Sequence, residues 1–354
     1  MIYINGLSNI SPQPTSDKKN FLSEVVQYNT NMLQCTEPDY TDFMDTNALR
    51  RMSRVLKLGS AGARFCLEDA ALEVPDAICI GTGKGCFKNT QIFLFSVDEN
   101  KEKFIPPSPF IQSAHGSIAS QIAIQTGCKN YNMTYSHRAF SFESALLDAM
   151  MLLKEKKHTH VLLGGVDEIE EIQFKTFDRI GYYKKTEVNN LNLLAEQSKG
   201  TIAGEGSTFF LLEGHQTANT YAKVNDIHTF SNPISHLQVE EAITHFLSQN
   251  NLTVRDIDAL VLGLNGDIEF DGIYHELNAS LFKDNRQVYY KHLCGDYLTS
   301  SAFALWMSSM IKKHQRIPEI VSLNEKPAKE IQNILIYNQH RNVNHSLILV
   351  SGVA

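Results

Sequence analysis

The sequence lacks any long apolar run, because polar residues interrupt every candidate segment before it is long enough to cross a bilayer. Residues 1–12 (MIYINGLSNISP) also lack the basic region and the long apolar core of a secretory signal. We therefore expect no membrane span, a first strand at the N-terminus, and a cytoplasmic location.

An excess of basic residues is missing as well. The chain has 32 lysines and arginines against 39 aspartates and glutamates, which gives a net charge of −7. Proteins that bind nucleic acid draw much of their affinity from neutralised phosphates, and a net negative chain does not favour this. We therefore expect no nucleic acid among the partners.

Paired cysteines are absent too. The six cysteines are scattered without any CxxC motif, which argues against a disulfide framework or a zinc site and favours reduced, buried thiols. His158 and His160 are two residues apart, but a polar strand edge explains that spacing better than a metal site. We expect neither a metal nor a cofactor. The cysteines are Cys35, Cys66, Cys79, Cys86, Cys128 and Cys294.

The sequence does contain apolar strands that alternate with amphipathic helices. Asp76–Gly81 (DAICIG) and His160–Val166 (HVLLGGV) are short apolar runs typical of buried strands. Phe142–Lys157 has helical periodicity and ends in lysines that suit the helix dipole. Asn47–Leu72 is predicted as one further helix. This alternation predicts an α/β protein with helix-covered sheets.

The second part of the chain repeats this pattern. Asp258–Gly263 (DALVLG) matches DAICIG, and a helix predicted over Tyr297–Lys313 ends in lysines like the first one. We match Ser346–Val353 (SLILVSGV) to HVLLGGV. A recurring order of elements predicts a duplicated unit. We place the division just after Glu213, with halves 1–213 and 214–354 packed as one body.

Two common motifs are missing. GTGKG at Gly81–Gly85 has neither the GxxxxGK[ST] spacing of a phosphate-binding loop nor the GxGxxG of a dinucleotide site, so we interpret it as a tight turn after a strand. The chain also has no GxSxG segment, which excludes the usual serine nucleophile elbow.

The segment Gly200–Glu213 (GTIAGEGSTFFLLE) resembles the GxxxGEGxxxxxLE segment of the β-ketoacyl synthases, the Claisen-condensing enzymes of fatty-acid and polyketide synthesis. GGVDE at Gly164–Glu168, PPSPFIQSAHGSIASQIAI from Pro106 and KHLCGDYLTSSA from Lys291 resemble that family in the same order. The resemblance implies a thiolase-like fold, with two similar βαβ halves in a five-layered αβαβα arrangement that is nearly always dimeric.

The resemblance also gives the positions of the catalytic residues. A condensing enzyme carries its acyl group on a cysteine at a helix N-terminus, where the dipole favours the thiolate. In this chain the cysteine position, counted back from Ala145, falls on Ala139. A methyl group cannot hold an acyl chain.

Two histidines complete such a site by assisting decarboxylation and stabilising the oxyanion. The first position falls on Gly263, or on Leu264 if the register slips by one. The second falls on Asp296, although Lys291 five residues earlier is retained. The glycine-rich C-terminal loop of the family is replaced by NQHRNVN at Asn338–Asn344. We therefore expect no catalytic residues at these positions and no catalysis by the chain itself.

Other residues offer no obvious replacement. Ser136 and His137 are neighbours on a predicted strand and would point to opposite faces. Cys294 is interpreted as a packing thiol, and Glu205 and Asp167 as structural parts of turns. An independent enzyme, either a malonyl-carrier protein decarboxylase or an acyltransferase with non-standard residues, stays open as the alternative.

Among relatives, the chain most resembles the chain-length factors of type II polyketide systems, above all those of aryl-polyene and flexirubin-type pigment clusters. The resemblance implies an inactive subunit that forms a heterodimer with an active ketosynthase, shapes its acyl tunnel and meets an acyl carrier protein. The better-known chain-length factors have glutamine in the cysteine position, whereas this chain has Ala139. A homodimeric scaffold that binds the carrier protein is a further alternative.

Two groups of side chains would serve that role. Residues of the segment Pro109–Gln121 are expected to line the tunnel or the dimer interface, with Phe140 beside the emptied site. A basic helix face is expected to dock the acidic carrier protein, although a solvated face is an alternative explanation. The tunnel residues are Phe110, Gln112, Ala114 and Ile118, and the basic residues are Arg50, Arg51, Arg54 and Lys57.

Overall fold

Ten strands form one mixed sheet in the computed structural model, which describes residues 1–16, 21–103, 105–327 and 329–352. The strands are β1 (Ile2–Ile10), β2 (Ala77–Gly81), β3 (Tyr131–Tyr135), β4 (His160–Asp167), β5 (Gly206–Glu213), β6 (Ala222–Ser231), β7 (Ala259–Leu262), β8 (Arg286–Tyr289), β9 (Asn333–His340) and β10 (Asn344–Ser351). The helices are α1 (Thr46–Leu49), α2 (Arg54–Asp69), α3 (Phe87–Glu99), α4 (Pro107–Gln112), α5 (Ser117–Thr126), α6 (Ser141–Lys154), α7 (Glu171–Arg179), α8 (His236–Gln249), α9 (Gly272–Ala279), α10 (Lys291–Cys294) and α11 (Ser301–His314).

The order of the strands shows the duplication directly. The first half follows the order β3-β2-β4-β5-β1, and the second half follows β8-β7-β9-β10-β6, which is the same order with each strand replaced by its counterpart. The parallel and antiparallel pairings agree strand by strand. The halves meet where β1 pairs with β6 over only three residues, Ile2–Ile4 against Ala222–Val224. The division after Glu213 remains a prediction.

One correspondence from the sequence is wrong. The strand order makes β10, which contains SLILVS, the counterpart of β5 rather than of β4. The true counterpart of β4 is β9. Both β9 and β10 are covered on two faces and have four consecutive apolar residues, Ile334–Tyr337 and Leu347–Val350, so their patterns look alike. The polar end of β9, Asn338–His340, hides its relation to the glycine-bearing end of β4.

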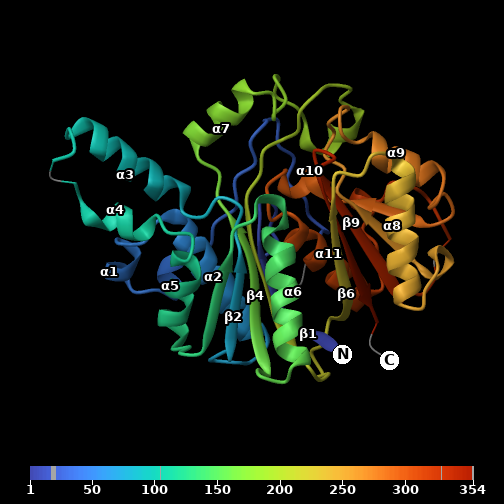
Figure 1. Cartoon of the computed structure of the whole chain (residues 1–354), viewed down its shortest axis with the longest axis horizontal. Helices are drawn as coiled ribbons and strands as arrows, with labels where there is room; N and C mark the ends of the chain where they lie inside the picture. Colours follow the sequence, from blue (N-terminus) through green and yellow to red (C-terminus); the bar gives the residue numbers. More distant parts are fainter. Residues whose placement is uncertain (17–20, 104, 328, 353–354) are drawn as a thin grey trace.

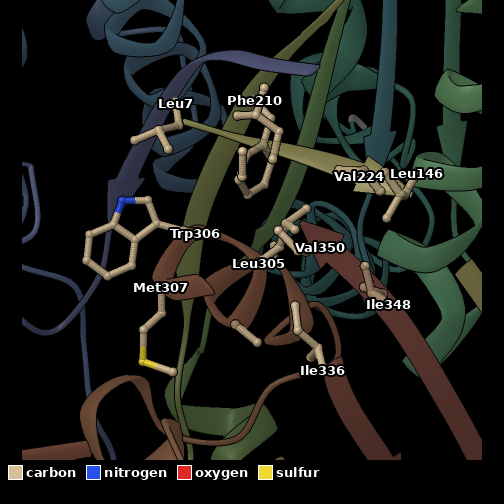
Figure 2. Close-up of a cluster of buried hydrophobic side chains, with 14 of the residues drawn as sticks. Leu7, Leu146, Phe210, Val224, Leu305, Trp306, Met307, Ile336, Ile348 and Val350 are labelled. Atoms are coloured by element: carbon tan, nitrogen blue, oxygen red, sulfur yellow. The ribbon is translucent and has the colours of Figure 1, made fainter. Parts of the chain in front are cut away.

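Alternate side chains of each strand enter different apolar layers. In β4, Leu163 packs into the central cluster and Leu162 into an outer one. In β9, Ile336 packs into the same central cluster and Leu335 into the outer cluster of the second half. Figure 2 shows the central cluster around Trp306.

Helices fill the three helical layers between and outside the strands. Helices α6 and α11 lie in the middle, α2 and α5 cover the first half, and α8 and α9 cover the second (Figure 1). The two five-stranded halves of the sheet form the two strand layers, and the result is the five-layered thiolase-like arrangement that the resemblance implies. Within the described ranges, no helix is long and apolar enough to cross a membrane.

The helix predicted over residues 47–72 is in fact two helices. Helix α1 ends at Leu49, and α2 begins at Arg54 after Ser53, a residue type that favours helix N-caps. The predicted helical repeat of basic residues across this break therefore does not exist. Further along, α3 and α4 project away from the sheet at one side of the molecule (Figure 1).

Candidate functional site

A cavity of about 460 Å³ opens where several strands end. Its lining includes Asp167 at the end of β4, His340 at the end of β9, and Lys84 in the loop after β2. The carboxyl ends of parallel strands are the usual place for a ligand in an α/β protein. Asp296, the predicted second-histidine position, also lines this cavity, so the resemblance and the geometry lead to the same place.

Asp296 forms an ion pair with the retained lysine. Its Oδ1 lies 2.6 Å from Lys291 Nζ, and the lysine side chain is almost fully buried. Burial alone would raise the pKa of Asp296, but the Lys291 ammonium and the neighbouring His340 hold it below its usual range. An aspartate in this state is an anion at neutral pH, so it cannot donate a proton as a histidine would.

Gly263, the predicted first-histidine position, has no room for a side chain. A Cβ atom added there would lie 2.3 Å from Asn338 Oδ1 and 2.6 Å from Tyr274 Oη. Both neighbours would have to move before any larger residue could fit. Leu264, the alternative position, is buried in the outer apolar cluster of the second half. A histidine at either position could be accommodated only if the neighbouring side chains were rearranged.

At the predicted cysteine position, the residue that faces the cavity is Arg138 and not Ala139. A short 3-10 helix, Arg138–Phe140, precedes α6, and Arg138 has a φ of +48°, a left-handed conformation that non-glycine residues seldom adopt. Arg138 lines the cavity, while Ala139 and Phe140 are buried beside it. Ser141 Oγ holds the turn by donating to the Arg138 carbonyl at 2.6 Å. Neither Arg138 nor Ala139 carries a nucleophile.

Asp167 is the structural centre of the loop after β2. Its Oδ1 accepts hydrogen bonds from the backbone N–H groups of Gly83 (2.9 Å) and Lys84 (3.2 Å). Its Oδ2 accepts from the N–H and hydroxyl groups of Thr299. The interpretation of GTGKG as a tight turn is therefore confirmed. The loop also extends Lys84 into the cavity, which the motif did not indicate.

Two glycines bring the GEG segment against the loop that bears Asp296. A Cβ atom on Gly204 would lie 2.1 Å from the Cys294 carbonyl oxygen, and Gly295 has a φ of +72°. Only residues without a side chain allow this approach. The GEG resemblance thus marks a place where the two halves touch.

Glu205, between the glycines of that segment, is fully buried and accepts hydrogen bonds from several donors. The N–H groups of Cys35 and Ile169 donate to it at 2.6 and 2.9 Å. The Arg54 guanidinium donates through both terminal nitrogens. Its structural role is confirmed.

Arg54 is therefore not available as a free docking residue, which corrects the prediction. Its guanidinium also pairs with Glu37, so the whole group is engaged. Arg50 and Arg51 are exposed, but they lie in the turn between α1 and α2 rather than on a helix. Lys57 is half-buried.

The predicted tunnel residues divide into two groups. Phe110 and Ala114 are exposed, and Gln112 bridges Asn89 and the Arg51 carbonyl. Ile118, on α5, is buried against α2 in the outer layer of this chain, and its assignment to the tunnel or the interface stays a prediction. Phe140 is buried next to His137 and does not line the cavity.

No cysteine offers an easy substitute nucleophile, because all six are buried. Burial raises the pKa of the Cys294 thiol well above its ordinary value, which favours the unreactive protonated form. This agrees with the interpretation of Cys294 as a packing thiol.

Several cavity residues escaped the sequence analysis. Burial lowers the pKa of His340 to about 4, so its ring is neutral at physiological pH. Arg341, Gln173 and Tyr182 also line the cavity. The altered loop NQHRNVN was the one available signal for His340 and Arg341, since it marks where the chain departs from the family.

Residues 6–218 match the family model described as the β-ketoacyl synthase N-terminal domain, which is more than half of the chain. The chain belongs to the β-ketoacyl synthase family. No curated protein matches this sequence.

Three solved structures share the fold of this ketosynthase-like chain over nearly their whole length. The ishigamide ketosynthase/chain length factor superposes on this chain with a TM-score of 0.81 at 15% sequence identity. The alignment covers 100% of this chain and 99% of that one. A β-ketoacyl synthase from Burkholderia phymatum STM815 has a TM-score of 0.77 at 15% identity, with the same coverage. A structure titled "AntDE:AntF (apo): type II PKS acyl-carrier protein in complex with its ketosynthase bound to the hexaketide" has a TM-score of 0.79 at 14% identity and 99% coverage of both chains.

Proposed function

We propose that this chain is a non-catalytic, ketosynthase-like subunit, a chain-length factor that pairs with an active β-ketoacyl–acyl carrier protein synthase in polyketide or polyene biosynthesis. The observation that carries the proposal is the state of the second-histidine position. Asp296 is anionic there and paired with Lys291, so it cannot supply the neutral, hydrogen-bond-donating imidazole that assists decarboxylation and stabilises the oxyanion. Gly263 and Ala139 add two further positions without a functional group.

One end of the sheet offers a surface suited to the proposed partner. Strand β3 is one of the two terminal strands of the sheet, so one of its edges is free to pair with another strand, whereas the other terminal strand, β8, already forms a bridge from Val288 to Ser322. Exposed apolar side chains surround that edge, namely Met133 on β3, Leu147 and Met151 on α6, and Ile124 on α5. An open strand edge within an apolar surface is typical of a protein–protein interface. A partner of the same fold would continue the sheet and cover these side chains.

The partner can be tested by co-expression with a ketosynthase that has the Cys–His–His triad. We expect the two chains to purify as a one-to-one complex. Met133→Asp places a charge on the open edge and should abolish the complex, whereas Ile234→Asp, at a site that is 90% exposed in the other half, is the matched control and should not. A chain that elutes alone, or only as a homodimer, would refute the heterodimer.

A carrier protein is proposed as the second partner, docked on the exposed Arg50 and Arg51. Acidic proteins are steered by local basic patches even when the net charge is unfavourable. Replacing both with glutamate should weaken carrier-protein binding at least tenfold in surface plasmon resonance. Lys129→Glu, another exposed charge reversal, is the control. Equal losses in both variants would contradict a specific docking site.

The alternative of an independent decarboxylase or acyltransferase would have to use side chains of the cavity. His340 is the best placed, since it lies beside Asp296. A histidine whose pKa is lowered to about 4 by burial is a weak base at neutral pH. The geometry therefore supports the non-catalytic subunit better.

A further inference from the structure

Three cationic side chains lie around the cavity without a carboxylate partner. Lys84 Nζ is 3.9 Å from the ring centre of Phe177, and Arg341 Cζ is 4.2 Å from that of Tyr182. Arg138 is exposed at the same cavity. Among the ion pairs of the described residues, none involves these three side chains. Positive charge at the site is therefore available to a ligand.

The carboxylates nearby are already occupied. Asp167 receives hydrogen bonds from its loop and from Thr299, and Asp296 is paired with Lys291. Burial raises the pKa of Glu168, the third cavity carboxyl group, to about 7, so much of it is neutral at physiological pH. These carboxyl groups reduce the net positive charge of the cavity but form no ion pair with Lys84, Arg138 or Arg341.

The cavity also has buried polar atoms that bind nothing in the described part of the chain. They are Glu168 Oε2 and Gln173 Oε1, both on residues that line the cavity. Glu168 and Gln173 are each only 3% exposed. A buried polar atom without a partner costs about 1–3 kcal/mol, which a bound polar group or an ordered water would recover.

The remaining walls are largely aromatic and aliphatic. Phe177, Tyr182 and Tyr183 supply aromatic rings, and Ile169 and Leu298 supply aliphatic surface. The volume of about 460 Å³ is within the range of small-molecule sites, roughly 300–1,000 Å³. Such walls suit a planar apolar body better than a sugar or a polyol.

The type of anion follows from the loop after β2. A phosphate group is usually held by free backbone N–H groups. Here the N–H groups of Gly83 and Lys84 donate to Asp167, and that of Gly85 donates to Thr82 Oγ1. The loop therefore has no open cradle for phosphate. A site that offers side-chain cations but no free backbone N–H groups favours a carboxylate ligand over a phosphate.

We infer that this cavity binds a small carboxylate with a flat apolar body, its charge facing Lys84, Arg138 and Arg341 and its body against the aromatic wall. The site is complete within one chain. It therefore does not depend on the proposed heterodimer, and either proposal can fail without the other.

The probe is 2-naphthoate, and its uncharged counterpart is 2-naphthamide, each titrated into the full chain by isothermal calorimetry. We expect naphthoate to bind and naphthamide to bind at least tenfold more weakly. Lys84→Met and Arg341→Gln should each weaken naphthoate binding at least tenfold. Lys129→Met, an exposed lysine away from the cavity, is the matched control and should leave the affinity unchanged.

Three results would overturn the inference. They are equal binding of both probes, no binding of naphthoate at 5 mM in the folded wild-type chain, and displacement of naphthoate by an equal concentration of inorganic phosphate. Because two variants at different loops are used, misfolding of one, seen by circular dichroism, leaves the other to decide.

Discussion

Replacing Arg54 with methionine should destabilise the fold rather than weaken carrier-protein docking. The substitution keeps most of the apolar stem but removes the guanidinium that donates two hydrogen bonds to Glu205. Glu205 is fully buried, so after the change its charge would be compensated only by the N–H groups of Cys35 and Ile169.

The cost can be estimated from the burial of the pair. Removing one partner of a buried ion pair typically costs about 3–5 kcal/mol, because an uncompensated charge stays inside. The Arg54 side chain is 23% exposed, so water reaches it in part, and we expect the lower end, about 3 kcal/mol. With an m value near 3 kcal/mol/M, the urea midpoint should fall by about 1 M.

The assay is urea unfolding followed by circular dichroism, with Arg64→Met as the matched control. Arg64 lies on the same helix α2 and pairs with Glu68, but both side chains are more than half exposed. Exposed pairs of this kind contribute about 0.5 kcal/mol or less. Adding Glu205→Gln to Arg54→Met should recover part of the loss, since it removes the buried charge. A midpoint for Arg54→Met within 0.2 M of the control would refute the structural role.

Other predictions concern the cavity and its surroundings. The introduced cysteine of Arg138→Cys should react quickly with iodoacetamide, and that of Ala139→Cys slowly, because residue 138 lines the cavity and residue 139 is buried. The six native thiols are buried and give a low background, so mass spectrometry can measure both rates. The reverse order of rates would show that residue 139 faces the cavity. Burial raises the pKa of Glu143 to about 7, so the folded state binds the proton more tightly than the unfolded state and stability should fall as pH rises from about 4.5 to 7. Glu143→Gln should remove this pH-dependent loss and thereby raise the free energy of unfolding at pH 8 by up to about 3 kcal/mol. A gain in stability that is the same at pH 4.5 and at pH 8 would contradict the raised pKa. Burial also lowers the pKa of Lys84 to about 8, with Asp167 and Asp296 opposing the shift, so naphthoate affinity should fall as the pH rises through 8, and ionisation of Glu168, whose pKa burial raises to about 7, should add to the fall. An unchanged calorimetric affinity at pH 9.5 would show that the lysine charge is not used.

The layers of the fold could be predicted from the sequence because they depend on local patterns. After their first aspartate, runs such as DAICIG and DALVLG have no polar side chain, which requires cover on both faces, and their repetition indicated the duplication. The mistaken match of β10 to β4 has the same origin. Because β4, β9 and β10 all contain a buried apolar run, composition does not distinguish them from one another, and only the hydrogen-bonded order does.

The sequence could locate only those site residues that lie within or next to a recognisable motif. Of the three positions that the resemblance implies, Asp296 lines the cavity, whereas Gly263 and Ala139 do not, and the surroundings of all three were not predictable. Asn338 limits the space at Gly263 from 75 residues away, and Arg54 reaches Glu205 across 151 residues. The exposure of Arg138 to the cavity depends on a left-handed backbone that no sequence pattern indicated.

The most direct test of a non-catalytic role is mass spectrometry of malonyl-carrier protein incubated with the purified chain. We expect no loss of carbon dioxide and no acetyl-carrier protein from the chain alone, and condensation products once a ketosynthase with the Cys–His–His triad is added. Turnover by the chain alone that disappears in the His340→Ala variant would contradict the proposed function and identify this cavity as an active site.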